Sequence, residues 1–448
     1  MNRFSENYAV LAIWLLACGT ANAADLVIDD NFKPALPEIA DREVRLTGLS
    51  DEINTSVFAT AIERLHKEGG GRLVVPPGIW ITGPIHLKSG IELHLEEGAE
   101  LRFSTRYADY LPVVYQQRAG VRCYNYSPFI YARSCEDVAV TGKGVLNGQG
   151  QAWWPWKKKQ PGMMRLMEMC RDRTPLEERV FGKEEDGVRP DFIQFIDCRR
   201  VLLEGITAKD GPSWNIHPVW CEDLTIRGVS VVAHGPNSDG IDPDGCRRVL
   251  VEDCFLDTGD DAICLKSGRD QEGWDAARPC EDILICNCRA LAGYGLIVIG
   301  SEMSAGVRNV YAHDLTGIGT DRGIRIKTRR GRGGIVENIR IENLRLEKTR
   351  AEAIIINMRD GDRTLGEGVL SQQPKTDATP TFRNITIRNV TCHGAAKYSV
   401  RVIGIPENPI TGLVLEDLRI EATKPASIQY AEGTWDPGLF PSTAPEAR

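Results

Sequence analysis

The sequence lacks a long hydrophobic run and lacks an excess of positive charge. Its apolar stretch near the N-terminus, AVLAIWLLACG at residues 9–19, is too short to span a bilayer. The 448 residues carry 54 Lys and Arg against 62 Asp and Glu, a formal net charge of −8, whereas nucleic-acid-binding proteins are more often basic overall. We therefore expect no membrane span and no nucleic-acid partner, and an anionic ligand would have to meet a local cluster of basic residues.

The composition also excludes two classes of protein. With 42% hydrophobic and 26% charged residues, the chain has enough apolar side chains for a sizeable core, so disorder and a collagen-like fibre are both disfavoured. A chain of this length holds either two or three ordinary domains or one long repeat array.

The N-terminus resembles an export signal. Arg3 precedes the apolar stretch, and Ala21-Asn22-Ala23 provides the small residues of a cleavage site, so residues 1–23 are interpreted as a signal peptide of a periplasmic or secreted protein. Two alternatives remain open. Leu15-Leu16-Ala17-Cys18 loosely resembles a bacterial lipobox, which would place a lipid anchor on Cys18, and the segment can also be an ordinary buried N-terminus.

A short pattern of alternating apolar residues recurs from about residue 134 onward. Its first clear units are CRRVLLEGI, CEDLTIRGV and CRRVLVEDC, and equivalent positions are Val201, Leu224, Val249, Ile283, Val310, Ile339 and Ile385. Neighbouring units are at least 23 residues apart, which is typical of a solenoid coil with surface insertions. The alternation has the period of a strand, and the Gly, Asn or Asp near the end of each unit tolerates a left-handed corner.

These repeats predict an all-β protein, a right-handed parallel β-helix over residues 51–428. A helix that presents Val57, Phe58, Ala61, Ile62 and Leu65 on one face is expected to cap its N-terminal end, and Gly69-Gly70-Gly71 would stop that helix. Period-two segments at residues 73–75, 79–81 and 91–95 would begin the coils. Residues 24–50 are interpreted as a lead-in, and residues 429–448, rich in Pro and Ala, as a loose tail.

The 13 cysteines of an exported protein invite a disulfide or metal interpretation. Five of them occupy the first position of a repeat unit, where later units have Val307, Val336 and Phe382; these five are Cys135, Cys198, Cys221, Cys246 and Cys280. That position therefore points inward, and we expect a stack of buried thiols that act as small hydrophobic groups. Scattered disulfides and a zinc site remain as alternatives.

Three aspartates form the candidate catalytic cluster. When Ile241, Ile263 and Ile297 are aligned as inward residues, one column contains Ser238, Asp260 and Tyr294, and the next contains Asp239, Asp261 and Gly295. Coils lie about 4.8 Å apart, so the carboxylates are crowded, and crowding raises at least one pKa. A protonated acid beside an ionised base is what glycoside hydrolysis requires. A bound cation, which Asp242 and Asp244 would join, and a hydrogen-bonded corner without function are the alternatives.

The predicted basic cluster lies two coils further on. Arg325 and Lys327 are two residues apart on one strand and so share a face, and Arg329, Arg330 and Arg332 follow closely. Arginine suits a carboxylate ligand because its guanidinium donates two parallel hydrogen bonds. A solvated charged strand is the alternative.

The ordered set of motifs resembles family 28 of the glycoside hydrolases, the polygalacturonases. That family's signature runs Asn-Thr-Asp, Asp-Asp, Gly-His-Gly and Arg-Ile-Lys, and here the corresponding segments are 237–239, 259–261, 293–295 and 325–327. The resemblance extends from about residue 51 to about 420. The segments 212–218 and 299–302 resemble bacterial exo-acting members in particular.

The resemblance implies roles for individual residues. Asp260 would be the general acid, and Asp239 and Asp261 would activate water, with inversion at the anomeric carbon. The substrate, a galacturonan of plant cell walls, would be bound by Arg325, Lys327, Tyr294, Asn237, Trp214 and His217. We expect no metal and no cofactor, and a monomer.

One residue departs from the family signature. Tyr294 stands where the family has histidine, and tyrosine donates a hydrogen bond but carries no positive charge at neutral pH. A shifted pH optimum, a different sugar at the cleavage site and a weakened enzyme are the three outcomes left open. Near the same cleft, an insertion at about 151–190 carries Trp153, Trp154 and Trp156, which either stack on sugar rings or pack against the coil beneath.

Other functions remain open at this point. A calcium-dependent pectate lyase would also use a parallel β-helix, with the aspartates as calcium ligands. A hydrolase directed at rhamnogalacturonan and a carbohydrate-binding β-helix without turnover are the further alternatives, and the sequence does not decide between internal and terminal cleavage.

Overall fold

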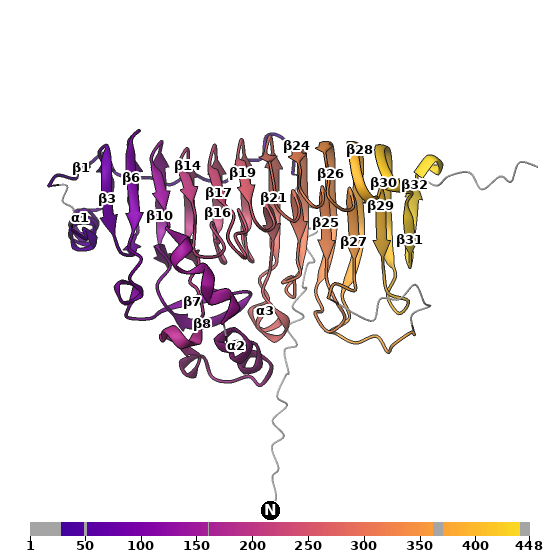
Figure 1. Cartoon of the computed structure of the whole chain (residues 1–448), viewed down its shortest axis with the longest axis horizontal. Helices are drawn as coiled ribbons and strands as arrows, with labels where there is room; N and C mark the ends of the chain where they lie inside the picture. The colour runs from indigo at the N-terminus through magenta and orange to yellow at the C-terminus, as the bar shows by residue number, and fades with distance from the viewer. Residues whose placement is uncertain (1–27, 49–51, 160, 362–370, 440–448) are drawn as a thin grey trace, which may run out of the picture.

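The computed structural model describes residues 28–48, 52–159, 161–361 and 371–439. In these ranges the chain forms a right-handed parallel β-helix, a single elongated stack of coils (Figure 1), so the predicted fold class is confirmed. The predicted signal peptide and Cys18 lie outside the described residues. Among the helices of the described part, none is long and apolar enough to cross a membrane.

Three longitudinal rows of parallel strands form the walls of the stack. The first row consists of β1 (Glu43–Arg45), β2 (Gly71–Val75), β5 (Ile91–Leu95), β10 (Glu136–Gly142), β14 (Arg199–Glu204), β16 (Glu222–Arg227), β18 (Arg247–Glu252), β21 (Cys280–Cys286), β24 (Val307–Ile318), β26 (Ile335–Glu347), β28 (Thr381–Tyr398), β30 (Ile410–Lys424) and β32 (Ala431–Trp435). The second row consists of β3 (Gly78–Thr82), β6 (Ala99–Phe103), β11 (Val145–Asn147), β15 (Thr207–Lys209), β17 (Ser230–Ala233), β19 (Phe255–Thr258) and β22 (Arg289–Ala290).

The third row consists of shorter strands and carries the candidate site. Its members are β4 (Ile85–His86), β9 (Ile130–Arg133), β13 (Ile193–Ile196), β20 (Ile263–Leu265), β23 (Ile297–Ile299), β25 (Ile324–Lys327), β27 (Ile354–Asn357), β29 (Val400–Ile403) and β31 (Ser427–Gln429). Between β13 and β20, the row is continued by isolated bridges at Ile216, Val219, Ile241 and Asp244. The regular ladder is therefore interrupted in the middle of this face.

The register predicted from the repeat units is confirmed. Val201 pairs with Leu224, Leu224 with Val249, and Val249 with Ile283. The same column continues through Val310, Ile339 and Ile385. All of these side chains are buried, because a parallel stack in register places the same inward position of every coil in one column.

The corners also follow the sequence. The Gly, Asn or Asp near the end of each of the seven repeat units has a left-handed backbone, with φ between +51° and +75°, and these residues are Gly205, Gly228, Asp253, Asn287, Asp314, Asn343 and Asn389. Residues with a bulkier Cβ substituent adopt this conformation only at a cost, whereas Gly, Asn and Asp tolerate it. Each unit therefore turns a corner at one of these three residues; in the first four units the strand ends there, whereas β24, β26 and β28 continue through it.

The cysteines line the interior as free thiols. The twelve described cysteines are all buried and unpaired, so the disulfide alternative is wrong for this part of the chain. Cys280 pairs in register with Val307, as expected if cysteine and valine fill the same inward position. Burial raises the pKa of the Cys221 thiol well above its ordinary value, which keeps it protonated and inert.

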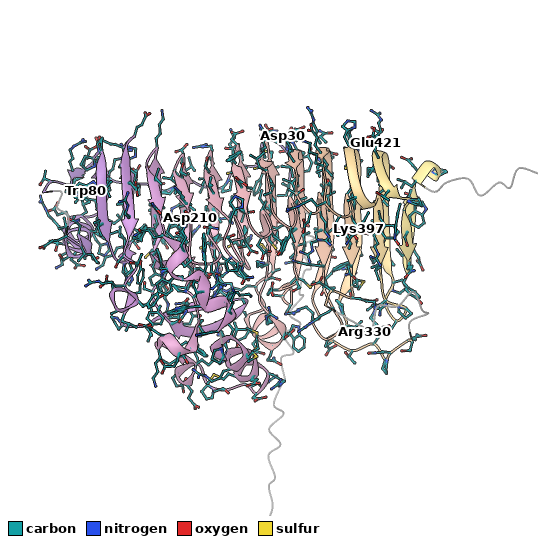
Figure 2. The ribbon with its side chains drawn as sticks, in the orientation of Figure 1. Asp30, Trp80, Asp210, Arg330, Lys397 and Glu421 are labelled. Atoms are coloured by element: carbon teal, nitrogen blue, oxygen red, sulfur yellow. The ribbon has the colours of Figure 1, made fainter. Side chains whose placement is uncertain are left out.

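A helix covers the N-terminal end of the stack, as predicted. Helix α1 (Thr55–Lys67) buries Phe58, Ile62 and Leu65 against the first coils, and Gly69 and Gly70 end it with positive φ. Phe58 also contacts Trp80 edge to face, with ring centroids 6.1 Å apart, and Trp80 is labelled at this end in Figure 2. Removing a side chain such as Phe58 from water contributes about 1.5–3 kcal/mol.

The lead-in segment is docked on the outside of the first row. Asp30, labelled above the middle coils in Figure 2, forms an ion pair with His313 at 3.0 Å, and Phe32 packs on a small apolar cluster that includes Leu250 and Tyr311. The chain then passes along the coils to β1, where Glu38 N–H donates to Asp137 Oδ1 at 2.9 Å. The segment thus crosses the stack in the direction opposite to coil order.

The predicted loose tail is wrong for its first residues. Strand β32 (Ala431–Trp435) pairs with β30 and extends the first row by one more coil, and the short 3₁₀ helix η6 (Pro437–Leu439) follows it. Strand β32 is short and mostly exposed, so its sequence has no run of buried apolar residues that would distinguish it from an irregular C-terminal tail. Residues 440–448 lie outside the described part.

Two insertions gather beside the third row (Figure 1). The first supplies the 3₁₀ helix η1 (Tyr107–Tyr110) and the antiparallel hairpin of β7 (Val114–Arg118) and β8 (Val121–Asn125). The second supplies the 3₁₀ helices η2 (Gly150–Ala152), η3 (Trp154–Lys158), η4 (Leu176–Glu178) and η5 (Glu184–Asp186), helix α2 (Pro161–Arg171), and β12 (Val180–Phe181), which pairs with β8. Helix α3 (Asp270–Ala276) contacts α2 and β8. These elements form a lateral layer over the interrupted part of the third row.

Candidate active site

A column of isoleucines positions the site from inside the stack. Ile241 pairs with Ile263 and Ile263 with Ile297, so the predicted alignment of the three coils is confirmed. All three isoleucines are at most 1% exposed. Asp239 and Asp261 each lie two residues before one of these isoleucines, outside the regular strands, and there their side chains line a cavity shared with the lateral layer.

Three carboxylates meet on this surface. Asp239, Asp260 and Asp261 each offer an oxygen, and these three oxygens all lie within 4.8 Å of one another. Asp239 and Asp261 are buried, whereas Asp260 is partly exposed. Like charges this close cannot all be ionised without compensation, so the neighbours of each carboxylate decide its protonation.

Cations hold one of the three carboxylates ionised. Lys327 Nζ donates to Asp261 Oδ2 at 2.7 Å, and Arg325 Nη1 lies 3.4 Å from Asp261 Oδ1. Burial favours the neutral form of Asp261, but Lys327 and Arg325 outweigh burial and hold its pKa below the ordinary value. Asp261 is therefore suited to act as a base.

The other two carboxylates have the opposite tendency. Burial, followed by the charge of Asp261, raises the pKa of Asp260. Burial and the charge of Asp260 raise the pKa of Asp239 well above its ordinary value, and Asp239 Oδ1 has no hydrogen-bond partner among the described residues. The pKa values of the adjacent Asp260 and Asp261 are thus moved apart, as in an acid and base pair.

Lys266 was missed by the sequence analysis. Its ammonium is 2% exposed and lies 3.6 to 3.7 Å from carboxylate oxygens of Asp239, Asp242 and Glu302. It also lies 4.3 Å from the ring centroid of Trp214. Burial alone would favour the neutral amine, but Cys264 and the three carboxylates raise the pKa of Lys266 well above its ordinary value. A lysine three residues after the inward Ile263 gave no signal in the repeat pattern, because the acids around it come from two other segments, Asp239 and Asp242 from one coil and Glu302 from another.

Asp242 and Asp244, the predicted additional members of a cation site, are fully buried and do not line the cavity described below. Asp244 accepts hydrogen bonds from Gln117 Nε2 at 2.6 Å and from the Gly268 N–H at 2.8 Å. Burial raises the pKa of Asp242 to about 7, although Lys266 acts to lower it. Neither residue extends the three-carboxylate cluster outward.

A metal ion at the three aspartates would compete with cations of the protein itself. Their oxygens are close enough to share an ion, but Lys327 and Arg325 contact Asp261, and Lys266 faces Asp239. Calcium takes six to eight oxygen ligands in proteins. A site with three carboxylates and three adjacent cations therefore fits a metal poorly.

The carboxylates open into a cavity of about 660 Å³ between the third row and the lateral layer. Five of the predicted site residues, Asn237, Trp214, Tyr294, Arg325 and Lys327, line it together with the three aspartates. The lateral layer contributes Arg118, Ala119, Lys157, Met163, Met164, Met167, Glu168 and Arg171, and the remaining lining residues are Lys266, Arg269, Ser301 and Glu302. Seven basic and five acidic residues thus line the cavity, which provides the local basic surroundings that an anionic ligand requires.

His217 does not reach this cavity, and its predicted contact with substrate is corrected. Its side chain is 0% exposed and lies between Asp191 and Asp244, with Nδ1 at 2.8 Å from Asp191 Oδ2. Although burial acts to lower it, these two carboxylates raise the pKa of His217 to about 9. The His217 imidazolium packs edge to face against the ring of Trp214, with ring centroids 4.7 Å apart.

The predicted basic cluster is smaller than expected. Arg330 pairs with Glu407, and Arg332 is 1% exposed with Nη1 at 3.3 Å from Asp270, so these two side chains stabilise loops instead of lining the cavity. Figure 2 labels Arg330 on a loop below the third row, beyond the lateral layer. The backbone leaves the strand after Lys327, and strand periodicity therefore no longer predicts the direction of the following side chains.

The tryptophans of the insertion are structural. Trp153 is fully buried and Trp156 is 9% exposed, and they pack on each other and on Tyr107 and Tyr126. Trp154 donates its indole N–H to the Gly211 carbonyl at 3.0 Å. The packing alternative is therefore confirmed, and stacking of Trp153 and Trp156 on sugar rings is wrong.

A buried polar network attaches the lateral layer to the stack, and sequence reasoning did not find it. Arg118 at the end of β7 forms an ion pair with Asp191 at 2.5 Å and a hydrogen bond with Ser213. Gln194 Nε2 donates to the Gln117 carbonyl at 2.8 Å. Since Arg118 and Ala119 line the cavity, this network positions one wall relative to the carboxylates.

Comparisons with known proteins place this geometry in context. The family model described as glycosyl hydrolases family 28 matches residues 179–434. A probable polygalacturonase of Vitis vinifera is 30% identical over 385 residues, which cover 83% of this chain and 72% of the relative. An exo-poly-alpha-D-galacturonosidase of Dickeya chrysanthemi is 22% identical over 409 residues, which cover 84% of this chain and 66% of the relative. The crystal structure of a hyperthermoactive exopolygalacturonase from Thermotoga maritima matches with a TM-score of 0.84 and 38% identity, covering 90% of this chain and 93% of that chain.

The position of Lys266 predicts a stability change that depends on pH. Replacement by Met leaves Asp239, Asp242 and Glu302 buried without their shared cation, which should lower the free energy of unfolding by about 3–5 kcal/mol. Without the ammonium, the folded-state pKa values of Asp239 and Asp242 rise further above their unfolded values. The folded state then binds more protons than the unfolded state, so the loss should be smaller at pH 4 than at pH 8. Urea denaturation of Lys266→Met and of the exposed control Lys143→Met at both pH values tests this, and an equal loss at both would contradict it.

Proposed function

The chain belongs to glycosyl hydrolase family 28, and from this premise we propose that it hydrolyses α-1,4 bonds between galacturonates of plant-wall pectin, acting from a chain end. The observation that carries the proposal is the pair of adjacent aspartates with oppositely moved pKa values, Asp260 upward and Asp261 downward, within a cation-rich cavity. Two of the similar proteins, from Dickeya chrysanthemi and Thermotoga maritima, are by their names exo-acting enzymes on galacturonan.

In this proposal the raised acid protonates the leaving group. Asp260 is the partly exposed member of the cluster and keeps its proton to higher pH, so it is assigned to the glycosidic oxygen. Asp261, held ionised by Lys327 and Arg325, accepts a proton from the attacking water, and Asp239 on the neighbouring coil orients that water. Bond cleavage leaves a protonated leaving sugar and adds the water oxygen to the anomeric carbon.

The stereochemical outcome needs its own test. Inverting glycosidases usually separate their two carboxyl groups by about 6.5–9.5 Å, to leave room for water, and retaining ones by about 5–5.5 Å. The nearest oxygens here lie within 4.8 Å of one another, which by this general rule would favour retention. Inversion is proposed instead on the family resemblance, and it is supported by the cation contacts of both Asp261 oxygens, which disfavour that carboxylate as a nucleophile.

The lateral layer favours cleavage at a chain end. One wall of the cavity is formed by Met163, Met164 and Met167 of α2 and by Arg118 of the hairpin. The contacts of Arg118 with Asp191 and Ser213 hold that wall in place. An endo-acting enzyme needs a groove that a polymer can pass through in both directions. A wall beside the carboxylates instead limits the number of sugar units that one side accepts.

The rival functions fit the site less well. A calcium-dependent lyase would need the aspartates as metal ligands, and the neighbouring cations oppose that use. A non-catalytic binder would not require carboxylates with separated pKa values. For the setting of the reaction we propose export to the periplasm or the medium as a monomer, on the strength of the signal-like residues 1–23, and anchoring through Cys18 remains the alternative.

Product analysis tests the reaction. On polygalacturonate, the wild type should release saturated galacturonate monomers, and Asp260→Asn should lower kcat by a factor of about 10²–10⁴ because the leaving group loses its proton donor. Asp257→Asn, on the same coil but paired with His234 and away from the cavity, is the matched control. Proton NMR at early times reads the anomer of the product. Unsaturated products that disappear in chelator would establish the lyase, and unchanged turnover of Asp260→Asn would reject the proposed acid.

The role of Lys327 predicts a shift of the pH profile. Its ammonium lowers the pKa of both Asp261 and Asp260, so Lys327→Met should raise both. Activity requires ionised Asp261 and protonated Asp260, and both limbs of the kcat/KM profile should therefore move to higher pH. The measurement is the pH dependence of kcat/KM on oligogalacturonate. If only KM rises and neither limb moves, Lys327 serves substrate binding alone.

Tyr294 provides a further test of the substrate. Its side chain is 45% exposed and lines the cavity beside Asp260, at the position where the family has histidine. An imidazolium would place a positive charge in the cavity, where the anionic substrate would bind, so Tyr294→His should raise kcat/KM on polygalacturonate several-fold, with Tyr294→Phe as the control that adds no charge. Lower activity of Tyr294→His than of wild type would indicate that the tyrosine belongs to the site of a different sugar.

A further inference from the structure

The two sides of the carboxylate cluster carry different cations. Along the third row, Arg325 and Lys327 lie two coils beyond Asp261, and they share that carboxylate. On the opposite, N-terminal side lie Lys157 of η3 and Arg189. Within the described part of the chain, neither of these two forms an ion pair with a carboxylate.

Lys157 is directed to the cavity by the packing of its own helix. Trp156 is buried against Tyr107, with ring centroids 4.5 Å apart, and the indole of Trp154 is hydrogen-bonded to the Gly211 carbonyl. The backbone of η3 is thereby attached to the coils on the N-terminal side of Asp239. The Lys157 side chain lines the cavity and makes no hydrogen bond with another described residue, whereas Lys158 and Lys159 do not line it.

Arg189 makes this side of the cavity positive. Its guanidinium is 2% exposed and donates to the Pro212 carbonyl at 2.8 Å, to the Pro236 carbonyl at 2.6 Å and to Asn237 Oδ1 at 2.9 Å, which are all uncharged acceptors. Its Nε is buried without a partner among the described residues. Burial, together with the charges of Arg189 and Arg118, lowers the pKa of Lys157 and outweighs the opposite effect of Asp260 and Asp239, so an anion bound beside the ammonium would add compensation that the protein supplies only in part.

We propose that Lys157 determines specificity: its ammonium binds a second uronate carboxylate, on the side of the cleaved bond opposite to the carboxylate held by Arg325 and Lys327. This inference rests on the proposed galacturonan hydrolysis. A polymer in which every sugar carries a carboxylate satisfies both sides at once, whereas one in which uronates alternate with neutral sugars leaves one cation unpaired. Lys157 lies in the insertion that follows β11, outside residues 179–434 that the family model matches.

A mutant cycle with methyl esters tests the proposal. Digalacturonate is compared with its two monomethyl esters, one at each uronate, and kcat/KM is measured for the wild type, Lys157→Met and the adjacent control Lys158→Met. The wild type should lose about tenfold or more on either esterification, since each removes one charge-assisted contact. Lys157→Met should lose activity on unesterified digalacturonate but become indifferent to esterification of one uronate only. Lys158→Met should behave as the wild type, and Lys157→Arg should keep both penalties.

The other possible results reject either the second carboxylate site or the proposed function. If Lys157→Met keeps both ester penalties, or if the wild type tolerates one of the two esters, the second carboxylate site is overturned. Arg325→Gln should become indifferent to the ester that Lys157→Met still rejects, and indifference of both variants to the same ester would also overturn it. A wild type that leaves unesterified digalacturonate and longer oligogalacturonates intact would reject the proposed function itself.

Discussion

The parallel register between coils is the constraint on which the rest of this molecule depends. Coils about 4.8 Å apart place equal positions of successive repeats in one column, so that inward isoleucines and cysteines stack and outward aspartates meet. The column of Ile241, Ile263 and Ile297 fixes where Asp239 and Asp261 emerge. A shift by one residue would turn the isoleucines of this column outward, so their burial resists it and the positions of Asp239 and Asp261 are kept with them. The same regularity that stabilises the stack therefore brings like charges together, at a cost that the surrounding cations offset.

The cations do more than compensate charge. Lys327 and Arg325 contact Asp261 and lower its pKa, while burial and the charge of Asp261 raise the pKa of Asp260. Lys266 is almost fully buried beside the cluster and is shared by acids from two other segments. Because each cation has a different set of neighbours, three chemically identical carboxylates obtain different proton affinities. That difference is what an acid and a base in one cavity need.

The lateral layer gives the site its shape and part of its charge. The hairpin of β7 and β8 and the insertion that follows β11 are held against the third row by buried polar contacts, above all between Arg118 and Asp191, and by the packing of Trp153 and Trp156. A β-helix face by itself is a shallow surface. The layer converts it into a cavity of about 660 Å³ and adds Lys157 and Arg171 to its lining. In the proposed function, recognition of the polymer thus depends in part on segments outside the repeat, whereas the chemistry depends on the repeat.

The sequence by itself determined the fold, the register and the three carboxylates, because these follow from a short periodic pattern in which equal positions have equal directions. Val201, Leu224 and the later members of their column, the left-handed corners and the inward cysteines all lie where that pattern places them. Only the tertiary structure decided the roles of Lys266, His217 and the insertion. Lys266 became significant because distant segments surround it with acids, and His217 is buried between two aspartates that sequence order does not bring together. The tryptophans are covered because the hairpin packs on them. Such contacts depend on which insertion lies over which coil, and the repeat pattern of the sequence contains no information about this placement.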